Sequence, residues 1–369
     1  MKRSWAEISL DNIVHNMKAI RAHVPAGTKY LGVVKADAYG HGAVQVARVL
    51  EENGADYLAV ACLAEAVELR AAGIKMPILI LGYTPVEDTA VLVEQNITQT
   101  VFTLENAKEY SARAAACGGT LRVHIKLDTG MSRLGFLCDG DDFAASRDAI
   151  AAACRLPNLD IEGVFTHLAV SDEPGEEAEA YTRRQFRLFT GMIAAVEELG
   201  VHFRIRHCAA TGGTLFYADE MALDMVRPGL LLYGYGDDGR LGLRPCMKLC
   251  SRITSVKTFA PGTTISYGRT WTAPAATRMG VIPVGYADGL HRTVSNKLAF
   301  VTKDGPAPQR GRICMDMCMI DLTELPDVGV GDVVEVFGPN ASLDEMAKAA
   351  GTITYELLCS VSKRIPRIY

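Results

Sequence analysis

The sequence of 369 residues lacks any long hydrophobic run, although 49% of its residues are hydrophobic. No stretch approaches the roughly 20 apolar residues that a membrane-spanning helix needs. The N-terminus carries two cations, Lys2 and Arg3, with no apolar run behind them, so a secretory signal is not expected. These absences predict a soluble, cytoplasmic protein, and the length predicts two domains.

An excess of positive charge is also missing. The chain has 38 Lys and Arg against 43 Asp and Glu, which gives a formal net charge of −5. Nucleic-acid binding depends on cations that neutralise phosphates, and no basic stripe gathers them in this sequence. The composition therefore argues against a nucleic-acid partner.

None of the ten cysteines forms a Cys-x-x-Cys pair. Several, such as Cys62, Cys208 and Cys359, are scattered through apolar runs. The nearest approach to ligand spacing is Cys314 with Cys318, but neither a second matching pair nor a His-x3-5-His motif accompanies it. We expect buried free thiols in a reducing compartment and no metal site.

The Gly-x-Gly-x-x-Gly turn of doubly wound sheets is absent, and no internal repeat is visible. Instead, short apolar runs alternate with helical patterns from residue 30 to about 233. Eight runs read as strands: Tyr30 to Val34, Tyr57 to Cys62, Pro77 to Leu81, Thr98 to Phe102, Arg122 to Leu127, Asp160 to Thr166, Arg204 to Cys208 and Met225 to Leu232. This order predicts an α/β fold with an eight-stranded (β/α) barrel of the TIM type.

Beyond residues 234–239 (GYGDDG) the pattern changes to short alternating stretches separated by turn residues. We expect residues 1–236 to form the barrel domain and residues 237–369 to form a mostly β domain. One helix is predicted in the second domain, from Leu343 to Ala350.

Lys35 ends the first apolar strand, and in such a barrel the carboxyl ends of the strands open into the active site. Desolvation lowers the pKa of an amine toward the range in which it acts as a nucleophile or base, so Lys35 is a Schiff-base candidate. A lysine that only extends from the strand end into water explains the position equally well.

Other strand ends carry further polar residues. A single buried histidine is more often a core residue than a catalyst, but cationic groups that converge on one rim are hard to explain by packing and suit an anionic cofactor or substrate. The residues expected there are Lys126, Asp128, Arg133, His167, His207, Thr211, Arg227 and Gly229.

Several segments together carry a family resemblance that extends along essentially the whole chain. Residues 34–42 (VKADAYGHG) look like the pyridoxal-phosphate attachment motif of bacterial alanine racemases, enzymes of fold type III. The other matching segments are 126–135 (KLDTGMSRLG), 165–169 (FTHLA), 226–229 (VRPG), 266–269 (SYGR), 284–289 (VGYADG), 311–316 (GRICMD) and the C-terminal stretch with Tyr355 and 364–367 (RIPR).

The resemblance implies an isomerase that racemises alanine and supplies D-alanine for cell-wall peptidoglycan. Lys35 would hold pyridoxal phosphate as an internal aldimine and then act as base or acid on one face of the α-carbon. Tyr267 would act on the other face, helped by His167, and would reach the barrel of a partner subunit in a homodimer. Arg227 would face the pyridine nitrogen, and its permanent charge keeps that nitrogen unprotonated.

The remaining roles follow from the same resemblance. His207 would support Arg227, and Arg133 would contact the cofactor ring oxygen or the substrate carboxylate. Lys126 would carry a carboxylate formed with carbon dioxide and so orient Arg133. The cofactor phosphate would be held by Tyr39, Thr211, Tyr355 and backbone amides near Gly229 and Leu230, and the substrate would contact Tyr286, Met315 and Asp316 of the partner.

Two positions bear on how closely the chain follows the family. The segment 207–211 reads HCAAT where the family has Asn before its hydroxyl residue, so Ala210 lacks one polar contact near the phosphate. Serine-preferring relatives replace the tyrosine that matches Tyr355 with a smaller polar residue, so Tyr355 favours alanine over serine.

Alternatives remain open at the level of the sequence. Tyr267 and Tyr286 could be buried packing residues, and Cys314 to Asp316 could be a strand followed by a turn. For the whole chain, the alternatives to an alanine racemase are a serine/alanine racemase, a decarboxylase of the same architecture and a non-catalytic pyridoxal-phosphate carrier. A decarboxylase needs a C-terminal Cys and Asp as proton donors and has no use for Tyr267.

Overall fold

The computed structural model describes residues 2–369 and divides into two compact units. The first, here called the barrel unit, contains Ile13–Ala38 and Ala43–Leu243. The second, the β unit, contains the described residues before Ile13, Tyr39–Gly42 and Arg244–Tyr369. The sequence analysis expected the boundary after residue 236 and expected the N-terminal residues in the barrel.

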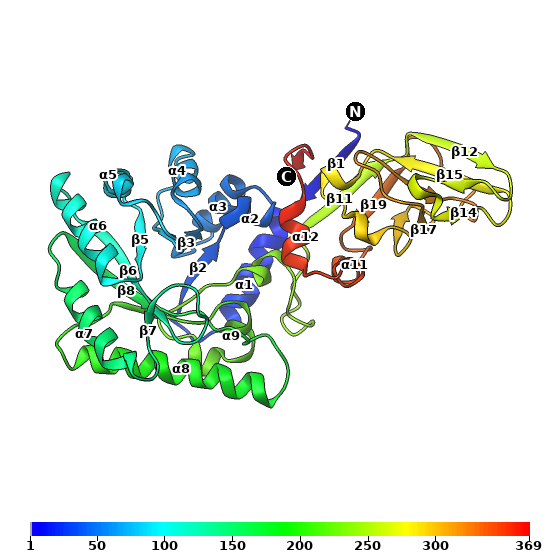
Figure 1. The fold of residues 1–369 in the computed structure, drawn as a ribbon. Helices are drawn as coiled ribbons and strands as arrows, with labels where there is room; N and C mark the ends of the chain where they lie inside the picture. The colour runs from blue at the N-terminus through cyan, green and yellow to red at the C-terminus, as the bar shows by residue number, and fades with distance from the viewer. Residues whose placement is uncertain (1) are drawn as a thin grey trace. The chain divides into compact units, whose positions relative to one another are not determined.

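The barrel unit is built on eight parallel strands in the described residues, joined in the order β10-β2-β3-β4-β5-β6-β8-β9 (Figure 1). Their bounds are β2 Lys29–Val33, β3 Tyr57–Val60, β4 Ile78–Ile80, β5 Thr98–Val101, β6 Leu121–Asp128, β8 Leu159–Phe165, β9 Ile205–His207 and β10 Met225–Val226. A short strand, β7 (Phe136–Leu137), pairs with the end of β6. Each run predicted from the sequence overlaps one of the eight strands, which confirms the fold class.

The eighth predicted run is shorter in the structure than in the sequence interpretation. Strand β10 stops at Val226, and Leu230–Tyr233 forms a 3-10 helix, η2. Pro228 and Gly229 lie between the two elements, and proline has no N–H to donate to a strand ladder. The break therefore places Arg227 at the barrel rim.

The seam between β9 and β10 is bridged by individual contacts. The Asp224 amide donates to the Arg206 carbonyl at 3.1 Å, and the Arg206 amide and guanidinium donate to the Asp224 carboxylate at 2.8 Å. Beyond the seam, the Arg227 amide donates to the Ala209 carbonyl at 2.9 Å. The barrel is thus nearly closed, and the two segments that carry His207 and Arg227 are held together.

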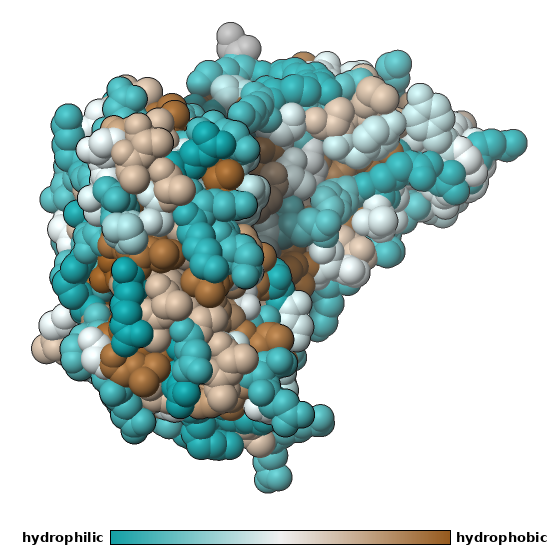
Figure 2. Space-filling model, turned by 60° about the vertical axis from the view of Figure 1, so that its left-hand side comes forward, coloured by the Kyte–Doolittle hydropathy of each residue, from teal (hydrophilic) through white to brown (hydrophobic). Residues whose placement is uncertain are grey.

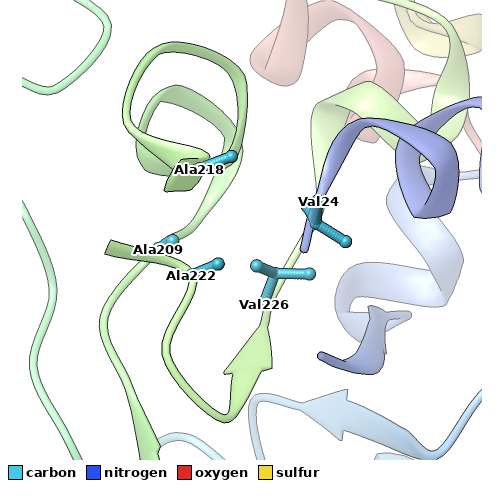
Figure 3. Close-up of a cluster of buried hydrophobic side chains, with 5 residues drawn as sticks. All are labelled: Val24, Ala209, Ala218, Ala222 and Val226. Atoms are coloured by element: carbon cyan, nitrogen blue, oxygen red, sulfur yellow. The ribbon is translucent and has the colours of Figure 1, made fainter. Parts of the chain in front are cut away.

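Small apolar side chains pack behind these two segments. Figure 3 shows Val24, Ala209, Ala218, Ala222 and Val226, which form one cluster of buried side chains from neighbouring segments. Ala209 and Val226 lie beside the polar residues of the rim along the chain. Because close packing resists displacement, the cluster holds the backbone that carries those residues.

Helices connect the strands, and local chemistry defines where they begin. Thr103 caps α6: its hydroxyl accepts from the Asn106 amide at 3.1 Å, and the Asn106 side chain accepts from the Thr103 amide at 3.2 Å. The α-helices of this region are α1 Leu10–His23, α3 Ala43–Glu52, α4 Leu63–Ala71, α5 Thr89–Glu94, α6 Leu104–Ala116, α7 Asp142–Cys154, α8 Glu176–Glu197, α9 Thr211–Phe216 and α10 Ala218–Met221.

The β unit contains a nine-stranded sheet with the order β12-β15-β18-β17-β16-β19-β11-β1-β20. Its strands are β1 Ser4–Ile8, β11 Met247–Arg252, β12 Ser255–Phe259, β15 Thr277–Ile282, β16 Ala299–Thr302, β17 Gly305–Arg310, β18 Cys318–Asp321, β19 Val333–Phe337 and β20 Arg367–Ile368. The N-terminal segment belongs to this unit because β1 pairs antiparallel with β11 and parallel with β20. A separate hairpin joins β13 (Thr264–Ile265) to β14 (Trp271–Thr272).

Helix α11 occupies Leu343–Ala350, the range predicted from the sequence. The Ser342 hydroxyl accepts from the Glu345 amide at 3.2 Å, and Gly351 ends the helix with φ of 73°. A second helix that the sequence analysis did not expect, α12, follows at Thr354–Ser360.

In residues 2–369, no helix combines the length and apolar character that crossing a membrane requires. Figure 2 shows one face of the molecule, on which hydrophilic side chains separate the apolar patches.

Candidate active site

Lys35 lies two residues after the end of β2 at Val33 and is half-buried. The next residues turn with left-handed backbone: Ala36, Asp37 and Ala38 have φ of 52°, 53° and 53°. Residues other than glycine rarely adopt this conformation, which costs about 1–2 kcal/mol per residue. Such strain persists only where the surroundings impose it, and it gathers at functional sites.

Glu65 of α4 is one of the groups that impose this turn. Its carboxylate accepts from the Ala36 amide and from the Ala61 amide, each at 2.7 Å. The carboxylate therefore ties the end of β2 to the end of β3. In addition, the Asp37 side chain accepts from the Ala43 amide at 2.7 Å.

Lys126 lies near the end of β6 and is only 4% exposed. Its ammonium donates to the Leu127 carbonyl at 2.7 Å and lies 5.4 Å from the centre of the Phe165 ring. Burial, followed by the charge of Arg227, lowers the pKa of Lys126 to about 7. A large share of this amine is therefore neutral at physiological pH.

Asp128 shapes the loop after β6, because its carboxylate binds backbone amides of that loop. Its carboxylate accepts from the amides of Gly130, Ser132 and Arg133 at 3.0, 3.0 and 3.1 Å. The Arg133 residue itself is exposed. Asp128 thus fixes the loop from which the Arg133 side chain extends.

Arg227 is 3% exposed and contacts two histidines that the sequence analysis placed with it. One guanidinium nitrogen lies 3.0 Å from His207 Nδ1, and the other lies 3.4 Å from His167 Nδ1. The second nitrogen also donates to the carbonyls of Thr166 and Cys208 at 2.8 and 3.1 Å. Burial lowers the pKa of Arg227 to about 10, so the residue stays a cation at neutral pH.

His167 is the point at which the charged groups of the rim act together. Burial, followed by the charges of Arg227, Lys126, Arg133 and Lys35, lowers its pKa to about 3. The imidazole is therefore neutral. The same charges show that Lys35 lies within electrostatic reach of the other cations, as the sequence predicted.

Thr211 and Leu230, two residues expected near the cofactor phosphate, lie around Gly236. A Cβ placed on Gly236 would meet Leu230 Cδ2 at 3.5 Å and Thr211 Cγ2 at 3.7 Å. Gly229 precedes η2 directly. Ala210 precedes α9 and supplies no side-chain cap to that helix.

Tyr39 and Tyr355 pack together within the β unit, with ring centres 5.8 Å apart. Tyr355 belongs to α12, the helix that the sequence analysis did not predict. Burial, with smaller contributions from Tyr355 and Cys359, raises the pKa of Tyr39 above its ordinary value. Tyr39 therefore keeps its phenol proton and can donate a hydrogen bond.

Tyr267 lies on the turn between β13 and β14 and is 67% exposed. Ser266 before it has φ of 65° and ψ of −174°, a conformation that is nearly confined to glycine. The Ser266 hydroxyl donates to the Arg312 carbonyl at 2.6 Å. The packing role left open for Tyr267 does not apply, because most of its surface faces water.

The other β-unit candidates lie near one another. The amides of Tyr286 and Ala287 donate to the carbonyls of Cys314 and Met315 at 3.1 and 3.0 Å. Tyr286 and Met315 are 44% and 52% exposed, so neither packs as a core residue. Asp316 lies in a loop, and its carboxylate accepts from the Arg364 guanidinium at 2.7 Å.

Beside the Tyr267 turn, the β unit has an open groove of about 420 Å³. Its lining includes Phe259, Ile265, Tyr267, Met279, Met317 and Met319. None of the ten cysteines forms a disulfide within the described residues. Among those residues, no cluster of His, Cys, Asp and Glu could hold a metal ion.

Comparison with known proteins assigns the family. The alanine racemase N-terminal domain matches residues 8–237, and the alanine racemase C-terminal domain matches residues 246–369. The chain belongs to the alanine racemase family. Family membership confirms the alanine racemase function expected from the sequence, and with it an isomerase that depends on pyridoxal phosphate.

Individual relatives match over the full chain. An alanine racemase of Desulforamulus reducens is 45% identical over 99% of this chain and 98% of its own length. The structure of the Clostridium difficile alanine racemase matches with a TM-score of 0.94 and 40% identity, over 100% of this chain and 96% of that one. The Bacillus anthracis alanine racemase with bound L-Ala-P matches with a TM-score of 0.88 and 32% identity, over 100% and 95%.

The donor set on the barrel rim suits the cofactor of the alanine racemase family. Pyridoxal phosphate needs an amine for covalent attachment and cations for an anionic group. Lys35, Arg133 and Arg227 supply these groups around the neutral His167. Between Thr211 and Leu230, Gly236 leaves a space that a Cβ would fill at van der Waals distance.

Sequence reasoning missed two acidic residues that organise this alanine racemase rim. Glu65 was not among the predicted site residues, although its carboxylate connects two strand ends. Glu162 in β8 was not considered, although its carboxylate lies 3.1 Å from His124 Nε2 in the barrel interior. An acidic residue in the middle of a buried strand was the signal that could have revealed it.

Proposed function

We propose that this enzyme interconverts L-alanine and D-alanine with two bases, Lys35 and Tyr267, that act on opposite faces of the α-carbon. A single base tends to return the proton to the face from which it came, so inversion needs a second group. Pyridoxal phosphate, when bound, withdraws electrons from the substrate and makes the α-proton acidic. The observation that carries the proposal is that one chain contains both a strained turn after Lys35 on the barrel unit and an exposed turn with Tyr267 on the β unit.

The geometry of His167 supports its assistance to Tyr267. A neutral imidazole has one donor and one acceptor nitrogen, and Nδ1 faces the Arg227 guanidinium at 3.4 Å. Nδ1 is therefore the acceptor, and Nε2 carries the hydrogen. A tyrosine has an ordinary pKa of about 10, and an N–H directed at its oxygen stabilises the phenolate.

Arg227 has a different role, because its guanidinium stays protonated at neutral pH. It donates hydrogen bonds to an acceptor such as a ring nitrogen and supplies no proton to it. We assign the phosphate to Tyr39, Thr211, Tyr355 and the backbone amides of Gly229 and Leu230. Arg133 contacts the carboxylate of the substrate or the ring oxygen of the cofactor.

We propose that two chains associate and that each barrel receives the partner's Tyr267. The support is the exposure of Tyr267, Tyr286, Met315 and Met317 in one region of the β unit, next to an apolar groove. Exposed apolar patches of this kind commonly mark interfaces between proteins. Tyr286, Met315 and Asp316 then contact the substrate from the partner side.

Complementation tests the shared site. Lys35→Ala and Tyr267→Phe chains, each inactive, are unfolded together and refolded as a mixture. If the partner supplies Tyr267, half of the dimers are mixed and each has one intact site, so about a quarter of wild-type activity returns. If both bases come from one chain, the mixture stays inactive.

Deuterium exchange tests the reaction itself. The holoenzyme incubated with L-alanine in deuterated water should yield D-alanine with deuterium at the α-carbon. Release of carbon dioxide would instead favour the decarboxylase, and absence of exchange would favour a carrier. The same assay with L-serine measures how strictly Tyr355 favours alanine.

We also propose that Lys126 is N-carboxylated. The ammonium first loses one proton to solvent. The neutral amine then attacks carbon dioxide, a C–N bond forms and a second proton leaves, so a cation beside Arg133 is replaced by an anion. The support is the buried amine with a pKa of about 7. Carbon-13 NMR with labelled bicarbonate should show a carbamate signal that Lys126→Ala abolishes and Lys29→Ala retains. A bare ammonium at Lys126 in an experimental density map would contradict the proposal.

A cytoplasmic location completes the proposal. Cys62 and Cys117 are exposed free thiols, and such thiols persist in a reducing compartment.

A further inference from the structure

A line of buried polar side chains runs from Arg227 into the interior of the barrel. Arg227 lies 3.0 Å from His207 Nδ1, and His207 Nε2 lies 2.8 Å from His124 Nδ1. His124 Nε2 in turn lies 3.1 Å from the Glu162 carboxylate. The proposed reaction uses only the first two members of this line.

The hydrogen positions along the line follow from its two ends. The guanidinium can only donate, so His207 Nδ1 accepts and His207 Nε2 carries the hydrogen. His124 Nδ1 must then accept, and its Nε2 must donate to Glu162, which as a carboxylate only accepts. Burial lowers the pKa of both imidazoles, which agrees with one hydrogen on each ring. Both histidines are therefore fixed as the tautomer with hydrogen on Nε2.

The same line of side chains connects the buried Arg227 cation to a carboxylate. Among residues 2–369, the hydrogen-bond partners of the Arg227 guanidinium are the carbonyls of Thr166 and Cys208 and the rings of His207 and His167, and the Phe165 ring lies 5.4 Å from it. None of them is an acid. The carboxylate to which Arg227 is connected is Glu162, two imidazoles away.

The fold leaves room for this line and holds its rings in place. A Cβ on Gly163 would lie 2.6 Å from His124 Cε1 and 2.7 Å from its Nδ1, so the ring rests on a bare backbone. The His207 ring stacks on Phe165 with centres 4.9 Å apart and planes 12° apart. Both histidine side chains are fully buried.

Glu162 is fixed by groups outside the line. It lies 3.6 Å from the Arg122 guanidinium and is hydrogen-bonded to Tyr57. Both interactions lower the pKa of Glu162, as does its hydrogen bond to His124, and together they outweigh the effect of burial. The far end of the line is therefore an anion held in one place.

We propose that Glu162 and His124 are positioning residues that fix the tautomer of His207 and so hold the Arg227 guanidinium toward the barrel rim. The effect on the cofactor rests on the role proposed above for Arg227. With glutamine in place of Glu162, an amide N–H could donate to His124 and reverse both tautomers. His207 Nδ1 would then present a hydrogen to Arg227, and two donors would face each other.

Nitrogen-15 NMR of histidine-labelled protein tests the tautomers directly, without reference to activity. In the wild-type apoenzyme and holoenzyme at pH 7, His124 and His207 should both be neutral with hydrogen on Nε2. In Glu162→Gln, both signals should change toward the other tautomer, whereas Glu162→Asp should keep the wild-type pattern. Hydrogen on Nδ1 of either ring in the wild type, or unchanged tautomers in Glu162→Gln, would overturn the proposal.

Measuring the affinity for pyridoxal phosphate tests the role of Glu162 and His124 separately from the role proposed for Arg227. Glu162→Gln apoenzyme should bind pyridoxal phosphate about tenfold more weakly, the equivalent of one hydrogen bond to a charged group. Asp160→Asn is the matched control, because Asp160 pairs with the same Arg122 at 3.3 Å without reaching a histidine. Its affinity should equal that of wild type. Reversed tautomers with unchanged affinity would support the line and overturn the assignment of Arg227 to the cofactor.

Discussion

The barrel rim and the Tyr267 turn carry their reactive groups in opposite ways. On the barrel, Arg227 is 3% exposed and His207 is fully buried, and each group is held by several neighbours. On the β unit, Tyr267 is 67% and Met315 is 52% exposed. The reactive side chains of the barrel rim are therefore buried in its own core, whereas those of the Tyr267 turn are exposed.

This difference shows what each region can do alone. Burial on the barrel changes proton affinities, as the pKa of about 7 for Lys126 and of about 3 for His167 demonstrate. Tyr267, in contrast, lies mostly in water, which screens charges. The barrel rim has its electrostatic character already, whereas the proposed shared site adds a second surface around Tyr267.

Lys35→Ala should produce the largest effect, because it removes both the attachment point and one base. We expect alanine racemisation to fall by at least about 10³-fold and the absorbance of covalently held cofactor to disappear. Circular dichroism of alanine and absorbance spectra provide the measurements. Lys29→Ala, an exposed lysine at the start of β2, should leave both unchanged. Retained covalent absorbance would show that another lysine is the attachment point.

Tyr267→Phe should reduce activity by roughly 10²- to 10³-fold while the cofactor stays bound. The loss should fall mainly on the reaction direction that begins on the tyrosine face, which deuterium exchange from L-alanine and from D-alanine measures separately. Tyr83→Phe, an exposed tyrosine of the barrel unit, should behave as wild type. Equal losses in both directions would count against two bases.

The same contrast explains how much the sequence could predict. The eight barrel strands were predictable because each is a short apolar run bounded by polar or turn residues, and Lys35, His167 and Arg227 stand near their ends. The grouping of these residues followed from the geometry of a barrel. Their pKa values did not, because these depend on distances between side chains that are remote in sequence.

Other features had no local signal. The turn at Ala36 to Ala38 contains no glycine, so nothing in its composition predicts left-handed backbone. The N-terminal strand joins the β unit through pairing with residues about 240 positions away, which a local pattern cannot show. Helix α12 is only seven residues long, too short for a clear periodic pattern.

Acid should destabilise the buried barrel region. Burial lowers the pKa of His124, His167 and His207, so below about pH 6.5 the unfolded chain binds protons that the folded chain does not. The free energy of unfolding therefore falls as the pH falls from about 6.5 toward 3, by about 1 kcal/mol over the first unit for His167 alone and by more with the other two histidines. Urea unfolding at several pH values should show this slope. His167→Asn should reduce this slope by the amount that corresponds to the uptake of about one proton on unfolding. His202→Asn, at an exposed site, should leave the slope unchanged.

Ser266 should give the smallest effect, at the exposed Tyr267 turn. Its backbone conformation is strained, and its hydroxyl attaches the turn to the Arg312 carbonyl. Ser266→Ala keeps the backbone strain but loses the hydrogen bond to the Arg312 carbonyl, so the free energy of unfolding should fall by about 1 kcal/mol. Ser266→Gly loses the same bond but relieves the strain at φ of 65°, so its net change should be close to zero. Both variants should slow exchange on the tyrosine face severalfold, since each frees the turn. Loss of stability without slower exchange would show that the hydroxyl supports the fold and does not orient Tyr267.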